Sequence, residues 1–135
     1  LIALSDFIVP NEPELSLLTD QPVNDIESVE KAAKILLERG VQNVIVTLGA
    51  NGALIVNKDI TKHIPSFKVD VVDTTAAGDA FIGGFASALL LEKSLEEAVR
   101  YGCACGALAT TRFGAQPSLP TKAEVEKFMS LREGA

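Results

Sequence analysis

Two hydrophobic patterns alternate along the chain. Residues 6–9 predict a short apolar strand that ends at Pro10. Residues 43–48 form an apolar run without alternation, which is typical of a strand buried on both faces. In residues 26–39 the apolar positions recur at helical spacing and share one face, so this stretch predicts an amphipathic helix. Asp25 can begin that helix as a capping residue, and Gly40 can end it. The chain therefore mixes buried strands with amphipathic helices.

The same signals place the remaining elements. Residues 53–56 and 60–64 are expected to pair as a hairpin, and residues 69–72 to form another short strand. Further helices are predicted to end near residue 18 and to span residues 78–91, 94–111 and 121–131. The last two begin with capping boxes. Because strands alternate with helices, we expect an α/β fold with an open, mostly parallel sheet.

Three positions directly follow predicted strands: Asn11, Gly49 and Asp73. In open α/β sheets, ligands bind at the carboxyl ends of the strands. These positions are therefore the first places where the sequence predicts chemistry.

The composition indicates how large the protein's core is and which classes of partner it is expected to lack. The 135 residues suffice for one compact domain, and the 47% of hydrophobic residues predict a substantial core. Lys plus Arg number 12 against 18 Asp plus Glu, which gives a net charge of -6. An acidic chain repels phosphate backbones, so we expect no nucleic-acid partner. A polyphosphate ligand would need backbone N–H donors instead.

Cysteine usage and hydropathy bear on the compartment. Cys103 and Cys105 form a C-x-C pair without the further Cys or His of a zinc site, so we expect reduced, buried thiols. The most apolar run, residues 80–91, is too short to span a membrane. The first residues lack the basic region of a signal peptide. These features predict a cytoplasmic protein without a membrane partner.

The strongest chemical signal is the loop of residues 73–79, which runs into a predicted helix. Small residues at 76–78 let a ligand approach the backbone, and the N–H groups of Ala76, Ala77 and Gly78 can converge on an anion. A carboxylate at Asp79 could accept a proton from a hydroxyl group while those donors hold a phosphoryl group. This combination suits phosphoryl transfer. The alternative is that Asp79 only offsets the helix dipole.

Residues 73–86 resemble the second signature of the ribokinase family of sugar kinases, the PfkB family. Residues 9–14, 47–52 and 111–120 resemble, in the same order, the Asn-x-x-Glu motif, the nucleotide loop and the late cation loop of that family. The resemblance covers essentially the whole chain but only the carboxyl-terminal half of the family. It implies a ribokinase-like, three-layer α/β fold, of which residues 1–135 are the nucleotide-binding and catalytic portion.

The resemblance also implies roles for single residues. Asp79 resembles the base that deprotonates the sugar, and Ala76, Ala77 and Gly78 resemble the anion hole for the γ-phosphate of ATP. Gly78 and Asp79 therefore also lie at the nucleotide. Asn11 and Glu14 resemble the residues of the family that organise Mg²⁺ and phosphate, largely through water. The alternatives are a helix cap for Asn11 and a solvated helix position for Glu14.

Two further groups follow from the resemblance. ATP would be held by the loop Thr47, Leu48, Gly49, Ala50, Asn51 and Gly52, with Cys103 where relatives often place a polar residue beside the adenine. A monovalent cation, usually K⁺, would be held by Asp73, Thr75, Ala109, Arg112, Gly114 and Ser118, partly through backbone oxygens. The alternatives are an ordinary glycine turn for the first group, and a loop cap at Asp73 with a helix-end cation at Arg112 for the second.

Some features point to structure alone. We expect His63 to be structural or solvated. The pair Gly83 and Gly84 costs roughly 1 kcal/mol per residue inside a helix, which predicts close packing of that helix against the sheet.

The sugar-binding residues, the Gly-Gly motif and the lid of the family have no counterpart here. We therefore expect the chain alone to be weakly active or inactive, with an exposed edge at residues 6–9 that invites self-association or pairing with a missing amino-terminal half. The late loop favours D-ribose as the sugar, converted to D-ribose 5-phosphate. The alternatives are a fructokinase, a 2-keto-3-deoxygluconate kinase, or a nucleotide-binding module without catalysis.

Overall fold

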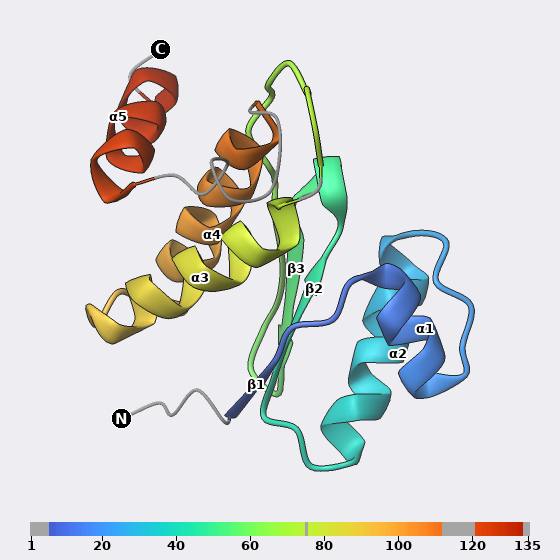
Figure 1. Ribbon diagram of the computed structural model, residues 1–135. Helices are drawn as coiled ribbons and strands as arrows, with labels where there is room; N and C mark the ends of the chain where they lie inside the picture. The colour runs from blue at the N-terminus through green and yellow to red at the C-terminus, as the bar shows by residue number, and fades with distance from the viewer. Residues whose placement is uncertain (1–5, 75, 112–120, 134–135) are drawn as a thin grey trace. The chain divides into compact units, whose positions relative to one another are not determined.

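The computed structural model describes residues 6–74, 76–111 and 121–133 (Figure 1). The chain forms two compact units, Leu1–Ile64 and Pro65–Ala135. We call them the amino-terminal unit and the carboxyl-terminal unit. Each contains a hydrophobic cluster of its own.

A four-stranded sheet forms the centre of the amino-terminal unit. Its order is β1 (Phe7–Ile8), β2 (Asn43–Thr47), β3 (Ala53–Asn57) and β4 (Thr61–Ile64). β1 and β2 are parallel, whereas β2–β3 and β3–β4 are antiparallel, which confirms the predicted hairpin. The expected mostly parallel sheet is thus corrected to a mixed one in these strands. The short loops after β2 and β3 cannot form the crossover that a parallel pair needs.

Helices α1 (Glu12–Thr19) and α2 (Ile26–Glu38) connect β1 to β2 and pack against one face of the sheet (Figure 1). Alternate strand residues outside that cluster, such as Ile45 and Ile55, are also fully buried. Burial of both sets explains why β2 and β3 are apolar without alternation. The cluster under the two helices comprises Leu15, Val29, Ala32, Ala33, Leu36, Val44, Val46, Leu48, Leu54 and Val56.

The carboxyl-terminal unit contains α3 (Ala77–Leu90), α4 (Leu95–Thr110) and α5 (Lys122–Glu133). The three predicted helices are confirmed to within two residues at each end. The capping boxes that begin α4 and α5 are also confirmed, since Glu97 N–H donates to Ser94 Oγ and Glu124 N–H donates to Thr121 Oγ1, each at 3.2 Å. Local sequence thus determines where these helices begin.

The strand predicted at residues 69–72 is wrong. Val71 and Val72 are each 58% exposed. The N–H groups of Val72 and Asp73 donate to the carbonyl oxygen of Thr110, at 2.7 and 3.0 Å, rather than to a neighbouring strand. Among the described residues this β-branched run joins no ladder, and β propensity alone does not form a strand.

The glycine pair in α3 behaves differently from the expectation. A Cβ atom on Gly84 would overlap Sγ of Cys105, so the close partner of this residue is α4. In the described part of the chain, no atom would lie within 4 Å of a Cβ on Gly83, so the space there is open. Of the two glycines, Gly84 is thus the one in close packing, and its neighbour is α4.

Both cysteines are buried and unbonded, as predicted. Burial raises the pKa of Cys103 to about 12 and that of Cys105 to about 11, so both remain neutral thiols near neutral pH. In the described part of the chain, no three His, Cys, Asp or Glu residues gather in a way that could hold a metal ion. No helix there is long and apolar enough to cross a membrane.

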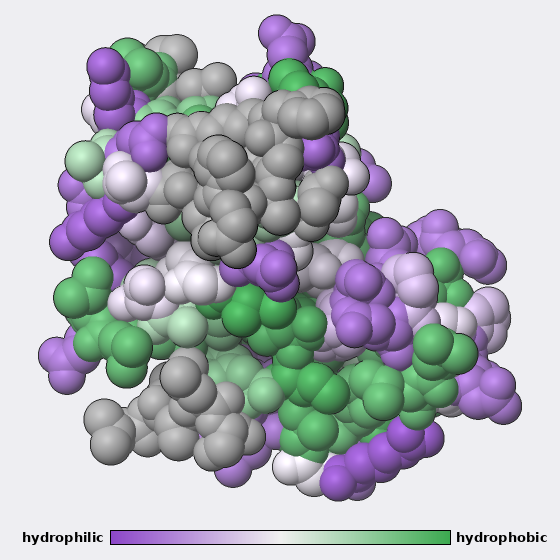
Figure 2. Space-filling view, in the orientation of Figure 1, coloured by the Kyte–Doolittle hydropathy of each residue, from purple (hydrophilic) through white to green (hydrophobic). Residues whose placement is uncertain are grey.

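Large apolar side chains also lie on the surface. Figure 2 shows apolar patches on the face it draws. The most exposed examples in the carboxyl-terminal unit are Leu90, at 74%, and Leu131, at 64%. Others are Leu17, Leu18, Val71, Val72, Ile82 and Leu91. Surface of this kind is often the site of contact with another polypeptide.

The two adjacent glycines offer a matched test of the α3–α4 contact. We expect Gly84→Ala to lower the free energy of unfolding by about 1–3 kcal/mol, because the new methyl group would overlap Cys105. Gly83→Ala should raise it by up to about 1 kcal/mol through helix propensity alone. Urea denaturation followed by circular dichroism measures both, and equal effects of the two substitutions would contradict the packing.

Candidate functional site

The carboxyl ends of β1 and β2 meet in the amino-terminal unit. Asn11 follows β1 and forms an isolated parallel bridge with Thr47 at the end of β2. The N–H of Thr47 donates to the carbonyl oxygen of Pro10 at 2.9 Å. The Asn-x-x-Glu segment and the predicted nucleotide loop therefore begin side by side, as their positions after strands led us to expect.

The predicted nucleotide loop is a tight turn. Its centre is the 3₁₀-helix η2 (Gly49–Asn51), and the N–H of Leu48 donates to the carbonyl oxygen of Gly52 at 2.8 Å. Gly49 and Gly52 have φ angles of 59° and 92°, and the second, with ψ at -128°, is a conformation that essentially only glycine adopts. Leu48 is buried while residues 49–51 are exposed, so the turn presents backbone to a ligand.

His63 on β4 supports that turn from outside. It is exposed, and its Nε2 lies within hydrogen-bond distance of the carbonyl oxygen of Asn51. This contact agrees with the structural or solvated role expected for His63.

Asn11 and Glu14 form a reciprocal capping box at the start of α1. The Glu14 N–H donates to Asn11 Oδ1, and the Asn11 N–H donates to Glu14 Oε1, both at 2.9 Å. The capping alternative for Asn11 is therefore correct, and Glu14 is more than a solvated helix position. Both residues are exposed, and the box uses one side-chain oxygen of each. Asn11 Nδ2 and Glu14 Oε2 are the atoms that would face a hydrated cation or a phosphate.

The start of α3 differs from the other helix starts. Side chains of Asn11, Asp25, Ser94 and Thr121 cap α1, α2, α4 and α5, whereas Ala76 provides no side-chain cap for α3. In the absence of a cap, the positive end of the helix dipole is left to solvent or to an anion. This arrangement fits the predicted anion hole.

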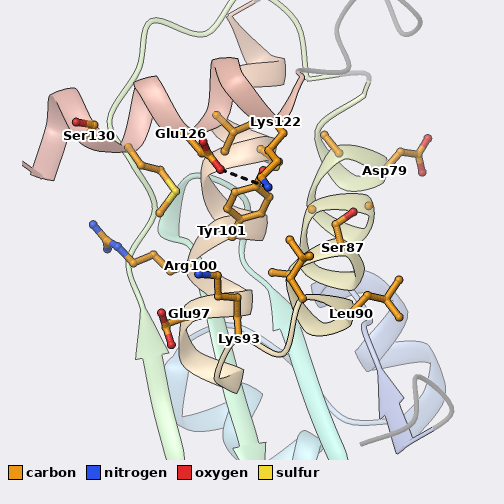
Figure 3. A pocket seen from close by; sticks show the side chains of 18 residues that line it. Asp79, Ser87, Leu90, Lys93, Glu97, Arg100, Tyr101, Lys122, Glu126 and Ser130 are labelled. Carbon is orange, nitrogen blue, oxygen red and sulfur yellow. Dashed lines mark ion pairs between the residues drawn. The ribbon is translucent and has the colours of Figure 1, made fainter.

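The residues predicted to bind the phosphate at the first turn of α3 differ in how accessible they are. Ala76 is buried, and the N–H of Ala77 already donates to the carbonyl oxygen of Thr74 at 3.2 Å. Gly78 and Asp79 are exposed, and the space beside Gly78 is open. The side chain of Asp79 points away from α4 (Figure 3). Gly78 and Asp79 are therefore the members best placed to meet a ligand.

The predicted cation site is described only in part. Asp73 is half-buried, and its N–H donates to the carbonyl oxygen of Thr110, the neighbour of the buried Ala109. Asp73 and Ala109 thus lie at the same end of α4, as a shared site requires. The other predicted ligands, Thr75, Arg112, Gly114 and Ser118, lie outside the described residues.

Sequence reasoning missed two contacts of α4 with the segment at residues 73–79. One is the bond from Asp73 to the backbone of Thr110, and the other is the close approach of Gly106 to Ala77. The spacing of Gly102 and Gly106 at i, i+4 was a usable signal, because it places two residues without side chains on one helix face. Cys103, predicted beside the adenine, is 4% exposed on the same helix.

An open crevice of about 1510 Å³ lies between α3, α4 and α5 (Figure 3). Tyr101 stands at its centre, and Lys122 and Glu126 form an ion pair across one turn of α5 at 3.8 Å. Burial raises the pKa of Tyr101, so its hydroxyl stays neutral. Asp79 belongs to the rim, but its side chain turns outward from the crevice (Figure 3). The start of α3 thus borders the crevice, while the carboxylate of Asp79 faces away from it.

Comparison with known proteins agrees with the sequence motifs. The model of the pfkB family carbohydrate kinases matches residues 1–122. A ribokinase from Haemophilus influenzae is 46% identical over 129 residues, which are 96% of this chain and 42% of that protein. The chain thus spans about two fifths of the length of this relative.

Solved structures give the same result. The crystal structure of a ribokinase from Thermotoga maritima matches with a TM-score of 0.86 and 52% identity, over 93% of this chain and 42% of that one. The structure of an Arabidopsis thaliana ribokinase complexed with ribose and ATP matches with a TM-score of 0.88 and 36% identity, over 92% and 40%. These matches confirm the ribokinase-like α/β fold.

Further relatives differ in their ligands and sugars. A putative ribokinase II from Escherichia coli, 36% identical, was solved with ATP and Mg²⁺, and a phosphofructokinase-2 from Escherichia coli, 31% identical, with potassium. A deoxyribokinase of Salmonella typhi and a fructokinase of rice are each 41% identical to this chain. All of these relatives are named as kinases, but their names give different sugars.

Two substitutions separate the capping role of Asn11 from a ligand role. Asn11→Ala should lower the free energy of unfolding by about 1 kcal/mol, whereas Asn11→Ser should leave it nearly unchanged, because serine caps helices as well as asparagine does. If Asn11 also organises Mg²⁺ and phosphate, both variants should bind Mg·ATP more weakly in calorimetric titrations. Unchanged affinity in Asn11→Ser would restrict Asn11 to capping.

Proposed function

The chain belongs to the PfkB family of carbohydrate kinases, and we propose that residues 1–135 are the nucleotide-binding and catalytic portion of an ATP-dependent sugar kinase acting on D-ribose. The observation that carries this proposal is the start of α3, where a helix without a side-chain cap presents Gly78 and Asp79 on an open surface. The reaction would convert ATP and D-ribose to ADP and D-ribose 5-phosphate.

Asp79 would act as the general base. Its carboxylate accepts the proton of the sugar hydroxyl while that oxygen forms a bond to the γ-phosphorus, and the bond from this phosphorus to the oxygen of the ADP leaving group breaks. The dipole and N–H groups at the start of α3, with Gly78 foremost, stabilise the charge on the transferred group. Asp79 then returns its proton to solvent.

The nucleotide would lie against the turn between β2 and β3. The proposal places ATP on Thr47, Leu48 and the exposed backbone of Gly49, Ala50 and Asn51, with Gly52 closing the turn. Its support is the rigidity of this glycine-dependent turn and its place beside Asn11. Cys103 is buried and lacks a strong hydrogen-bonding group, so it supports an apolar contact with the base rather than base-specific recognition.

The donor sets suit the two cations of the family. Glu14 Oε2 offers an acceptor to the water shell of a Mg²⁺ ion that keeps most of its water, and Asn11 Nδ2 offers a donor to an ATP phosphate. When bound, Mg²⁺ neutralises phosphate charge. The carbonyl groups at the end of α4, including that of Ala109, lie at the negative end of the helix dipole and suit K⁺ together with Asp73. Thr75, Arg112, Gly114 and Ser118 would complete that site.

D-ribose is favoured over other sugars by the late loop at residues 111–120 and by two relatives named ribokinase, at 46% and 52% identity. A fructokinase or a 2-keto-3-deoxygluconate kinase is the alternative within the family. A nucleotide-binding module without catalysis is the alternative outside it, and the presence of Gly78 and Asp79 at the open start of α3 favours the kinase.

The partner of this portion would be the amino-terminal portion of such a kinase. The chain covers 40–42% of the three ribokinases compared above. The family resemblance implies that the sugar-binding residues belong to the remainder. β1 stands at the edge of the sheet, and apolar side chains such as Leu90 are exposed. An edge strand and an apolar surface are features that a further polypeptide, or a second copy of this chain, would cover.

The nucleotide assignment can be tested on the chain as it is. We expect it to bind Mg·ATP in the presence of K⁺, but to release little or no ADP in response to D-ribose, because the groups that orient the sugar supply much of the catalysis. A coupled assay for ADP, with a blank lacking sugar, measures the release, and calorimetry measures binding. Absence of nucleotide binding would contradict the proposal for this chain.

A chimera tests the catalytic role of Asp79. In the Thermotoga maritima ribokinase, this chain would replace the matching portion, which is 52% identical. We expect ribose-dependent turnover, and a loss of about 10²- to 10⁴-fold in kcat in the Asp79→Asn variant with little change in Mg·ATP affinity. Equal turnover in the two folded chimeras would overturn the assignment of Asp79 as the base.

A further inference from the structure

The last two turns of α4 hold both ends of the loop at residues 73–79. At the beginning of the loop, the Thr110 carbonyl oxygen accepts hydrogen bonds from the N–H groups of Val72 and Asp73, at 2.7 and 3.0 Å. At its end, the backbone of Gly106 lies against Ala77, so that a Cβ atom on Gly106 would be 3.2 Å from the Ala77 carbonyl oxygen. Gly106 and Thr110 are both buried.

The contact between Gly106 and the Ala77 carbonyl oxygen also affects the orientation of the Gly78 N–H. The carbonyl group of Ala77 and the N–H of Gly78 belong to the same peptide unit, which is planar and rigid. A group that pushes the Ala77 oxygen therefore turns the Gly78 N–H with it. Because Gly78 N–H is one of the proposed donors to the transferred phosphoryl group, its direction matters for binding.

We propose that Gly106 is a positioning residue: its lack of a side chain lets α4 support the Ala77 carbonyl and so fixes the direction of the Gly78 N–H. The inference rests on the proposed function for its catalytic meaning, but its geometry does not depend on that function. An alanine at position 106 would bring its methyl group closer to the oxygen than ordinary van der Waals contact, so the peptide unit would have to shift. The residue type at position 106 is thus restricted both by packing and by the need to orient the Gly78 N–H.

The same interface contains a matched control. A Cβ atom on Gly102 would lie 3.0 Å from the Phe81 carbonyl oxygen and 3.1 Å from the Phe81 ring, a tighter fit than at Gly106. Phe81 lies one turn further along α3, beyond the residues proposed to meet the phosphate. Gly102→Ala should therefore disturb packing at least as much as Gly106→Ala, without acting directly on the Gly78 N–H. Gly83→Ala, on the open face of α3, controls for helix propensity.

The test compares ATP with ADP. In the wild-type chain and the three variants, calorimetry in Mg²⁺ and K⁺ would give the ratio of ATP affinity to ADP affinity, and urea denaturation would give stability. We expect Gly106→Ala to reduce this ratio by about tenfold, because one hydrogen bond to a charged group is weakened, with ADP affinity unchanged. Gly102→Ala should cost more stability yet leave the ratio unchanged. Equal ratios in Gly106→Ala and wild type, or equal losses in both α4 variants, would overturn the proposal.

A measurement without nucleotide tests the positioning role of Gly106 independently of the proposed kinase function. In ¹H–¹⁵N spectra of the chain, Gly106→Ala should shift the amide signal of Gly78 more than Gly102→Ala does, and Gly83→Ala should shift it least. If the chain binds neither nucleotide, the proposed function fails, and this comparison alone decides the positioning role. A Gly78 signal that moves equally in the two α4 variants would overturn that role.

Discussion

Glycine residues on both helices let α3 and α4 approach at backbone distance, and this contact determines the direction of α3. Gly84 faces Cys105, Gly102 faces Phe81, and Gly106 faces Ala77. Each glycine costs about 1 kcal/mol of helix propensity relative to alanine, so the close contact must offset that cost. At Gly102 and Gly106 the nearest atoms of α3 are backbone carbonyl oxygens, which cannot move away through a rotamer change, so this contact restrains the first turns of α3.

The first turn of α3 lacks the side-chain cap that stabilises the start of each of the other described α-helices. Asn11, Asp25, Ser94 and Thr121 cap their helices, and a side-chain cap typically contributes about 1 kcal/mol. α3 begins at Ala76 without such a cap. A bound anion can take the place of the missing cap, and a ligand that binds only the folded state stabilises it by mass action. Local stability is thus lower where the proposed function needs open donors.

Local sequence predicted most of the fold and the candidate residues. The helix at Ile26–Glu38, the hairpin and the capping boxes depend on neighbours within a few residues, and all were found from pattern alone. The strand at residues 69–72 failed because a strand requires a partner that local pattern does not reveal. The mostly parallel sheet failed although the short loops before β3 and β4 already required antiparallel pairs. The contact of Gly106 with Ala77 joins residues far apart in the chain, and only the structure could provide it.

Exposure explains why the proposed chemistry needs more than the described residues provide. Gly78 and Asp79 lie on an open surface, and water there weakens every interaction with a phosphoryl group. Donors at a helix start stabilise a transition state far better when water is excluded. In the described structure, position 78 has no neighbouring atom within 4 Å on the side where a side chain would stand. In the proposed kinase, a bound sugar and the polypeptide that orients it would cover this end of α3, which agrees with the proposal that an amino-terminal portion carries the sugar-binding residues.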